Sequence, residues 1–443
     1  MNVVFIVLDT VRKDYVSPFN EEVDFTDNIE KIAKEGSAFQ NAVAQAPWTL
    51  PSHGSMFTGL YPWEHGATQT NLELDVEEDL LAEKLNDEGY RTACFSANPF
   101  ISKRVGTTAG FDKVETTIGP DRFDLFKSIN KKLKAFENRL DFGAFPKAEL
   151  LLQNISYSLN RFSGNETENL ISKATDFMEN NKEDDFFLFM NLMDCHLPLF
   201  PDKEYKEKHA EDVNPGKVRQ FPHRLISEGE EPDTESLKKL YRAQMDYLDD
   251  QIGNLYSFLE DEGLEEETMV VIVGDHGENL GEEGMLGHSF SVSKALVSVP
   301  LVVKSPEMEP GRREQQVELR ELHDLVLEQV GLEEDIDLGT KYAKGGMDRP
   351  EMDLAKIPKS MWDEYDEKLY FVRTPEKKVV GTENGEMTER QVGDGDSVRT
   401  SVLEKEVEKL SGCYEGESSG KKVDNMDEEI KNELKNLGYM QKE

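Results

Sequence analysis

The sequence predicts an α/β fold: a mostly parallel central sheet sandwiched by helices, followed by a small C-terminal α+β subdomain. Short apolar runs rich in Val, Ile and Phe, typical of buried strands, alternate with segments whose apolar residues recur at helical spacing. Such alternation favours a parallel sheet with helices on both faces. Ligands bind beyond the carboxyl ends of the strands in these sheets, so residues that follow strands are the first candidates for a site.

The expected elements can be given in chain order. Strands are predicted at residues 3–8, 92–96, 186–192, 269–273 and 299–303. Helices are predicted at residues 28–34, 80–86, 167–179 and 236–259, the last with Leu240, Met245, Leu248, Ile252 and Leu255 on one side. Pro51 is expected to open a further short helix that ends at Gly59, because proline suits the first helical position.

The chain divides into two expected domains. Residues 1–310 are predicted to form the α/β domain, with a polar, partly basic helical insertion at about 120–165. Residues 311–443 are predicted to form the C-terminal subdomain, because the periodic pattern weakens after about residue 310. Within it we expect a small antiparallel sheet around residues 368–380 and a terminal helix near 426–437.

The charge balance argues against nucleic acid as a partner. The 443 residues include 90 Asp and Glu against 51 Lys and Arg, a formal net charge of -39, and such a chain would be repelled by nucleic acid. An anionic substrate would face the same repulsion unless salt screens it, since the Debye length falls to about 3 Å at molar ionic strength. The acidic residues are spread along the whole chain, which favours the hypothesis of a salt-adapted protein.

The cysteines and the apolar runs bear on location. Cys94, Cys195 and Cys413 are odd in number and widely separated, so neither a disulfide framework nor a cysteine zinc site is expected. No run approaches the roughly 18 apolar residues that span a bilayer, and the first apolar segment is too short for a secretory leader. We therefore expect a cytoplasmic protein without a transmembrane segment. The oligomeric state is left open.

Acids and histidines follow three of the predicted strands. The first strand ends on Asp9, the third runs into Asp194 and His196, and the fourth runs into Asp275 and His276. A single aspartate after a strand is commonly a helix cap, but three such ends deliver these side chains to one edge of the sheet. The sequence thus predicts a shared functional site there.

Three motifs supply candidate chemistry for that site. Asp275 and His276 can bind one divalent cation through a carboxylate oxygen and an imidazole nitrogen, and the glycine-rich stretch after them leads to His288. His196 could ligate metal, hydrogen-bond an anionic oxygen or act as general acid, or could simply be a satisfied buried histidine. Thr49, at or just before a helix N-terminus, lies where N–H groups favour an anion; alone it would be only a cap.

Together these motifs resemble the sulfatase family of the alkaline phosphatase superfamily over most of the chain. The opening strand and Asp9, the stretch from Thr49 to Gly59, and His196-Leu197-Pro198 occur in family order. They are followed by Leu248-Asp249-Asp250-Gln251-Ile252-Gly253, by Asp275-His276-Gly277-Glu278, by Gly287-His288 and by a closing Leu437-Gly438-Tyr439. The resemblance implies an alkaline phosphatase-like fold and a hydrolase of sulfuric esters.

The chain departs from the family pattern at three positions. Thr49 stands where sulfatases carry the Cys or Ser that becomes formylglycine, and a threonine cannot become that aldehyde. His53 replaces the motif's arginine, and Thr10 replaces the second aspartate of the opening pair. A Thr49 alkoxide would attack instead, its pKa lowered by a bound metal, as threonine nucleophiles do in related phosphotransferases.

The resemblance also implies a site. Asp9, Asp275 and His276 would hold one divalent metal with the Thr49 oxygen as the reactive ligand; the family implies calcium, while the ligand types also suit manganese or zinc. His196 and His288 would contact the non-bridging oxygens and one of them would protonate the leaving group. His53 is expected near the anion, and Arg12 or Lys103 is a candidate for added positive charge.

Three hypotheses for the function follow. The first is a metal-dependent sulfatase-like hydrolase of sulfate or phosphate esters, small molecules or glycans, with Thr49 as nucleophile. The second is a phosphodiesterase, a phosphonate hydrolase or a phosphoryl-group transferase acting on a glycan or lipid head group. The third, from another class, is a non-catalytic anion-binding pseudoenzyme, favoured by the loss of the arginine and of one aspartate. The retained acids and histidines favour the enzymes.

Overall fold

The computed structural model describes residues 1–116, 166–334, 336–354, 357–391 and 400–413. Its centre is an eight-stranded sheet with the strand order β10-β2-β9-β6-β1-β5-β3-β4. The strands are β1 (Asn2–Leu8), β2 (Ser37–Val43), β3 (Arg91–Ser96), β4 (Lys113–Thr116), β5 (Phe186–Leu192), β6 (Thr268–Gly274), β9 (Leu301–Lys304) and β10 (Gly311–Glu318). Only β9 runs antiparallel to its neighbours, so the predicted mostly parallel sheet is confirmed.

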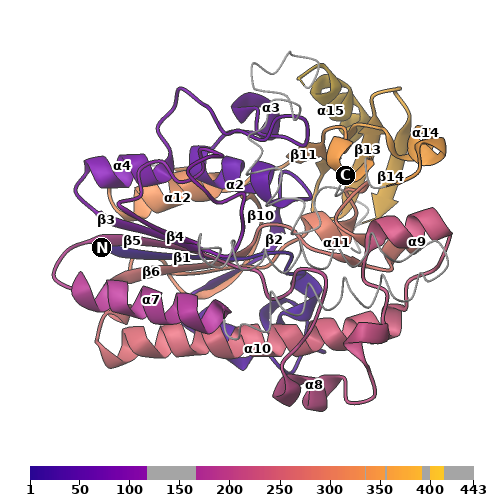
Figure 1. Cartoon of the computed structure of the whole chain (residues 1–443). Coiled ribbons are helices and arrows are strands. Elements are labelled where there is room, and N and C mark those ends of the chain that lie inside the picture. Colours follow the sequence, from indigo (N-terminus) through magenta and orange to yellow (C-terminus); the bar gives the residue numbers. More distant parts are fainter. Residues whose placement is uncertain (117–165, 335, 355–356, 392–399, 414–443) are drawn as a thin grey trace.

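Helices cover both faces of this sheet (Figure 1). One face carries α1 (Asp27–Glu35), α7 (Glu166–Asn180) and α10 (Thr234–Asp261), and the other carries α2 (Thr49–Thr58), α4 (Leu81–Asp87) and α12 (Glu321–Gln329). Strand β1 shows why both faces are apolar. Val4, Ile6 and Leu8 pack with the first set of helices, while the alternate residues Val3, Phe5 and Val7 pack with the second.

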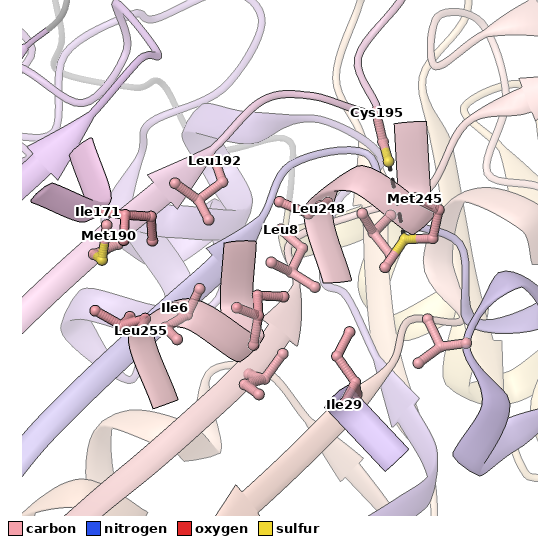
Figure 2. Packing of buried hydrophobic residues seen from close by; sticks show 14 of the residues in the cluster. Ile6, Leu8, Ile29, Ile171, Met190, Leu192, Cys195, Met245, Leu248 and Leu255 are labelled. Carbon is pink, nitrogen blue, oxygen red and sulfur yellow. Dashed lines mark hydrogen bonds between the residues drawn. The ribbon is translucent and has the colours of Figure 1, made fainter. Parts of the chain in front are cut away.

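The long helix α10 closes the first face with the stripe that the sequence predicts. Its five expected apolar residues are all buried in the same cluster, and Figure 2 shows three of them, Met245, Leu248 and Leu255, lying against the sheet. Shorter helices surround this framework: α3 (Pro62–His65), α8 (Lys203–His209), α9 (Pro222–Glu228) and α11 (Lys294–Val297). No helix in the described ranges has the length and apolarity that a membrane crossing requires.

A second, antiparallel sheet forms the C-terminal part. Its strands are β11 (Ala343–Met347), β12 (Leu369–Arg373), β13 (Lys377–Thr382) and β14 (Met387–Gln391), with α13 (Glu351–Leu354) and α14 (Trp362–Tyr365) in the connection before β12. Helix α15 (Thr400–Cys413) packs on one face through Leu403, Val407 and Leu410. The predicted small sheet around residues 368–380 is confirmed as the β12–β13 hairpin.

The structure corrects the predicted elements in two ways. Strands β2, β4 and β10 were not expected, because their apolar runs are interrupted by polar residues; most of the first half of β10 is exposed at the sheet edge. Since β10 and α12 follow residue 310, the central sheet extends past the boundary predicted between residues 310 and 311. The insertion expected at 120–165 and the terminal helix near 426–437 lie outside the described residues.

Helix α2 begins two residues earlier than expected. Thr49 is its first residue and Pro51 its third, whereas Gly59 ends it as predicted, with φ 76°. A proline fits at this position because the N–H groups of the first turn have no partner within the helix. Thr49 is thus inside the helix N-terminus, and the preceding Trp48 side chain provides no cap hydrogen bond.

The Leu248 to Gly253 motif has a structural explanation in the packing of α10 against α1. The Asp249 carboxylate accepts hydrogen bonds from the backbone N–H groups of Asn28 and Ile29 and from the Asn28 amide, all at 2.9 Å. Asp249 therefore caps α1 from another helix. Gly253 lies where a Cβ would come within 2.4 Å of Asn28 Cγ, so the two helices touch only because this position is glycine.

We predict that Asp249→Ala lowers the free energy of unfolding by about 1–2 kcal/mol, because the first turn of α1 loses its acceptors. Urea unfolding followed by circular dichroism measures this. Asp250→Ala is the matched control, since the neighbouring Asp250 accepts only an exposed hydrogen bond from Tyr205 and should change stability by less than about 0.5 kcal/mol. Equal losses in the two variants would contradict the capping role.

Candidate metal centre

The predicted strand ends converge on one buried group of side chains. Asp9 follows β1, and Asp275 and His276 follow β6, its neighbour in the sheet; all three have no exposed surface. One ligand atom from each lies within 4.8 Å of the other two. Because β1 and β6 are paired in register, with Leu8 opposite Gly274, their ends carry these residues to the same point.

Three atoms in this group have no hydrogen-bond partner among the described residues: Asp9 Oδ1, Asp275 Oδ2 and His276 Nε2. His276 Nε2 lies 3.5 Å from Asp275 Oδ2. Buried polar atoms are rarely left unpaired, so three such atoms facing one another require an explanation. Two carboxylate oxygens and one imidazole nitrogen form a ligand set suited to a divalent cation.

Each of these ligands is oriented by its other polar atoms. Asp275 Oδ1 accepts hydrogen bonds from the backbone N–H groups of Thr10 and His276, at 3.1 and 2.8 Å. His276 Nδ1 donates to Gly277 O at 2.9 Å, which leaves a lone pair on Nε2. Thr10 has φ 61°, a strained conformation for a β-branched residue, and this conformation turns its N–H toward Asp275. Such outer contacts fix metal ligands in place.

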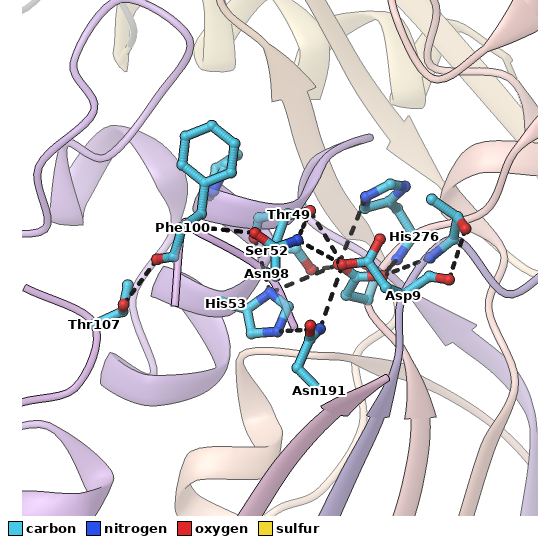
Figure 3. Close-up of polar contacts among 12 residues, drawn as sticks. Asp9, Thr49, Ser52, His53, Asn98, Phe100, Thr107, Asn191 and His276 are labelled. Carbon is cyan, nitrogen blue, oxygen red and sulfur yellow. Dashed lines mark hydrogen bonds and ion pairs between the residues drawn. The ribbon is translucent and has the colours of Figure 1, made fainter. Parts of the chain in front are cut away.

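Two asparagines hold Asp9, and the sequence interpretation missed both (Figure 3). Asp9 Oδ2 accepts hydrogen bonds from the side-chain amides of Asn98, at 2.8 Å, and Asn191, at 3.3 Å. The Asn98 amide is oriented because its Oδ1 accepts from Phe100 N. The sequence holds a signal for each: Asn98 lies just beyond β3, and Asn191 is a polar residue within the buried strand β5.

Thr49 lies beside this group. Its Oγ1 donates to Asp9 Oδ2 at 3.4 Å and accepts from Asn98 Nδ2 at 3.3 Å. The side chain is buried and stands at the positive end of α2, so it faces the candidate cation and the preferred position of an anion at once. Ser52, one turn along, donates to Asp275 O at 2.7 Å and ties the helix to the end of β6.

His53 is not placed to bind an anion, because both of its ring nitrogens make hydrogen bonds within the protein. Its Nδ1 donates to Thr49 O at 2.9 Å and its Nε2 accepts from the Asn191 amide at 3.4 Å. Burial lowers its pKa to about 4, so the ring is neutral. It therefore positions the first turn of α2, with Asp275 Oδ2 3.6 Å from Nδ1.

Two further histidines complete the group. The His288 ring centroid lies 4.7 Å from that of His276 and 5.2 Å from that of His196. Burial lowers the pKa of His196, and the neighbouring His288 adds to this. For His288 burial acts in the same direction, but the Glu278 carboxylate, 3.0 Å from Nδ1, more than offsets it and raises the pKa. Of the two histidines, His288 is therefore the more readily protonated.

The other expected charges lie elsewhere. Arg12 is buried and pairs with Asp14 and Glu282, each at 2.7 Å, so its charge is already neutralised. Lys103 is exposed. Asp194, expected at the same strand edge as His196, instead accepts a hydrogen bond from Thr167 at 2.5 Å. Burial together with the Asp9 charge raises the pKa of Asp275 well above its usual value.

Comparison with protein families agrees with this arrangement. The model of the sulfatase family matches residues 1–332. The chain belongs to the sulfatase family. Enzymes of this family use a divalent metal, and the buried group of Asp9, Asp275 and His276 offers a ligand set for one.

Individual relatives are distant. The chain is 24% identical over 332 residues to an uncharacterized sulfatase, YidJ, of Escherichia coli, covering 70% of this chain and 63% of that protein. It is 22% identical to the multifunctional alkaline phosphatase superfamily protein PehA of Trinickia caryophylli, covering 68% of each. The chain thus spans about two thirds of the length of these relatives.

Solved structures show the same fold. A phosphonate monoester hydrolase from Silicibacter pomeroyi superposes with a TM-score of 0.66 at 17% identity, covering 92% of this chain and 94% of that one. The protein BT4656, in complex with its substrate D-glucosamine-2-N,6-O-disulfate, superposes with a TM-score of 0.65 at 15% identity, covering 94% and 98%. At these identities the likeness concerns the fold.

We predict that Glu278→Gln lowers the pKa of His288, because the amide carries no charge to favour the imidazolium. Since the folded-state pKa is raised, the ion pair contributes stability below the unfolded-state pKa of about 6.5 and loses it as pH rises through the folded value. Histidine NMR titration measures the shift directly. Glu282→Gln, on the same loop but paired with Arg12, is the control. An unchanged His288 pKa in Glu278→Gln would contradict the assignment.

Proposed function

We propose that the chain is a metal-dependent hydrolase of sulfate or phosphate esters that uses Thr49 as its nucleophile. The observation that carries this proposal is the Thr49 hydroxyl beside three unpaired, buried ligand atoms, in a chain of the sulfatase family. Asp9, Asp275 and His276 would hold one divalent cation, with the Thr49 oxygen nearby. Such a cation supplies positive charge that lowers the pKa of the hydroxyl and offsets the charge of the ester anion.

The side chains of the site can be given roles in this reaction. Asp9 Oδ2, the acceptor of the Thr49 hydroxyl, would take its proton as the oxygen attacks sulfur or phosphorus. The N-terminus of α2 would stabilise the charge on the anion. His288, kept cationic by Glu278, would protonate the leaving oxygen as its bond to sulfur or phosphorus breaks. His196 would contact a non-bridging oxygen.

The proposed reaction then has two steps. Thr49 Oγ1 forms an ester with the sulfo or phosphoryl group while the alcohol leaves with the His288 proton. Water then attacks the same sulfur or phosphorus and would give a proton to His288, while the Thr49 oxygen leaves with the proton held by Asp9; sulfate or phosphate is released and both groups return to their starting states. An acceptor hydroxyl in place of water would make the protein a transferase.

Between the two ester classes the threonine favours phosphorus. Without formylglycine, the covalent threonine ester must be released by attack of water or of an acceptor hydroxyl at its sulfur or phosphorus, and the resemblance to phosphotransferases with a threonine nucleophile favours phosphorus. The fold likeness to a phosphonate monoester hydrolase is consistent with this second candidate. Sulfated sugars are the alternative substrates, because the comparable fold of BT4656 accepts one.

We predict that Thr49→Ala lowers kcat by roughly a thousandfold or more, whereas Thr49→Ser keeps measurable turnover, because a hydroxyl is required at this position. Assays use aryl sulfate, aryl phosphate, aryl phosphodiester and aryl phosphonate with a panel of divalent metals. They are run in high salt so that the net charge of the chain is screened.

Thr58→Ala is the matched control, since Thr58 lies on the same helix and donates only to Gly54 O. Rapid quenching and peptide mass spectrometry should find the sulfo or phosphoryl group on Thr49. Full activity in Thr49→Ala would refute the nucleophile. Failure of every substrate, with metal bound, would favour the anion-binding pseudoenzyme instead.

A further inference from the structure

Tyr241, in the first half of α10, has no exposed surface and lies outside the group of candidate ligands. Its helix runs along one face of the central sheet (Figure 1). The Tyr241 hydroxyl donates to Thr10 O at 2.6 Å and accepts from the backbone N–H of Arg12 at 2.9 Å. Both hydrogen bonds go to the turn that follows β1 and begins at Asp9, so α10 is tied to the backbone beside a candidate metal ligand.

The backbone of this turn is strained at Thr10. Its φ of 61° lies in the left-handed region, which is unfavourable for a residue branched at Cβ. Such a conformation persists only where the surrounding structure holds it. Here both flanking peptide groups are held: Thr10 N donates to Asp275 Oδ1 at 3.1 Å, and Thr10 O accepts from Tyr241. The first of these hydrogen bonds orients a candidate ligand, and the second stabilises the conformation that allows the first.

The turn also contacts the strand and the loop that carry the other candidate ligands. A Cβ on Gly274, the last residue of β6, would come within 2.7 Å of Val11 O, so the turn and the end of β6 touch. Arg12 Nη1 donates to Glu278 O at 3.3 Å, in the loop after β6. Movement of the turn would therefore disturb the segment from Gly274 to Glu278, which contains two of the candidate ligands.

The phenol of Tyr241 is suited to this position. Burial raises its pKa well above the usual value, so the hydroxyl keeps its proton and can donate to Thr10 O at neutral pH. The Tyr15 ring packs edge-on against the Tyr241 ring, with the centroids 4.7 Å apart, and fixes its orientation. A phenylalanine would fill the same space but would leave two buried backbone groups without this partner.

We propose that Tyr241 is a positioning residue of the metal centre, whose hydroxyl holds Thr10 in the left-handed conformation and thereby directs the Thr10 N–H at Asp275 Oδ1. This inference rests on the proposed metal-dependent function, since it concerns the ligands of the same cation. Thr10 occupies the position of the family's second aspartate, and through Tyr241 its backbone would serve the site in place of a carboxylate. Loss of a contact that orients a metal ligand typically lowers metal affinity about 10- to 100-fold.

Titration of the full-length chain with Mn²⁺, followed by the electron paramagnetic resonance signal of the free ion, tests this role without a substrate. Tyr241→Phe keeps the ring and removes only the hydroxyl, so we expect its Kd for Mn²⁺ to rise about 10- to 100-fold. Tyr256→Phe is the matched control, since it makes the same change further along α10, where the hydroxyl donates to Glu35. It should bind Mn²⁺ as the unaltered chain does. Circular dichroism checks that each variant is folded.

A second pair of variants tests the route through Thr10. Glycine adopts positive φ without strain, so Thr10→Gly makes the support from Tyr241 less necessary. We expect Tyr241→Phe to raise the Kd less than about threefold when Thr10→Gly is already present, against about tenfold or more in the unaltered chain. A loss of affinity caused only by general destabilisation would be the same in both backgrounds. The double variant also decides the matter if Tyr241→Phe alone does not fold, because it lacks the strained residue.

Three results would overturn the proposal, and each is distinguishable from the others. No Mn²⁺ binding by the unaltered chain would refute the metal centre of the proposed function, and the role of Tyr241 with it. Equal Kd values for the unaltered chain, Tyr241→Phe and Tyr256→Phe would refute the role of Tyr241 while leaving the metal centre in place. An equally large rise in Kd with Thr10→Gly present would show that Tyr241 does not act through the conformation of Thr10.

Discussion

The site depends on how three buried side chains use their polar atoms. Asp9, Asp275 and His276 each have one polar atom fixed by the protein and one left without a partner. Two adjacent carboxylates are costly in a buried setting, and the raised pKa of Asp275 reflects that cost. The surrounding hydrogen bonds hold the three unpartnered atoms close together despite this cost. Such an arrangement is expected of a preformed cation site.

The ends of the strands and helix α2 position the residues around these three side chains. Register between β1 and β6 brings the acids together, and β5 and β3 beyond them supply Asn191 and Asn98. Helix α2 brings Thr49 against Asp9 at 3.4 Å. Thr10, where the family pattern has a second aspartate, contributes its backbone N–H to Asp275, so this position still serves the site without a carboxylate.

The parallel sheet and the convergence of Asp9, Asp275 and His276 at one sheet edge were predictable because apolar periodicity and strand-end residues are local signals. The strand at residues 186–192 and the apolar stripe of α10 have the predicted limits and residues. Strand β10 was not predictable, since an edge strand rich in Arg, Glu and Gln lacks that periodicity. The roles of Asn98, Asn191 and His53 depend on hydrogen bonds between residues distant in sequence or on helix register, which no single motif contains.

The central claim is that the three unpaired atoms are the ligands of one divalent cation. Crystals of the chain grown with Mn²⁺, with an anomalous difference map at the manganese absorption edge, test it most directly. The account predicts one strong peak within about 2.6 Å of Asp9 Oδ1, Asp275 Oδ2 and His276 Nε2. Absence of a peak there from well-diffracting crystals, or a peak held by other residues, would contradict it.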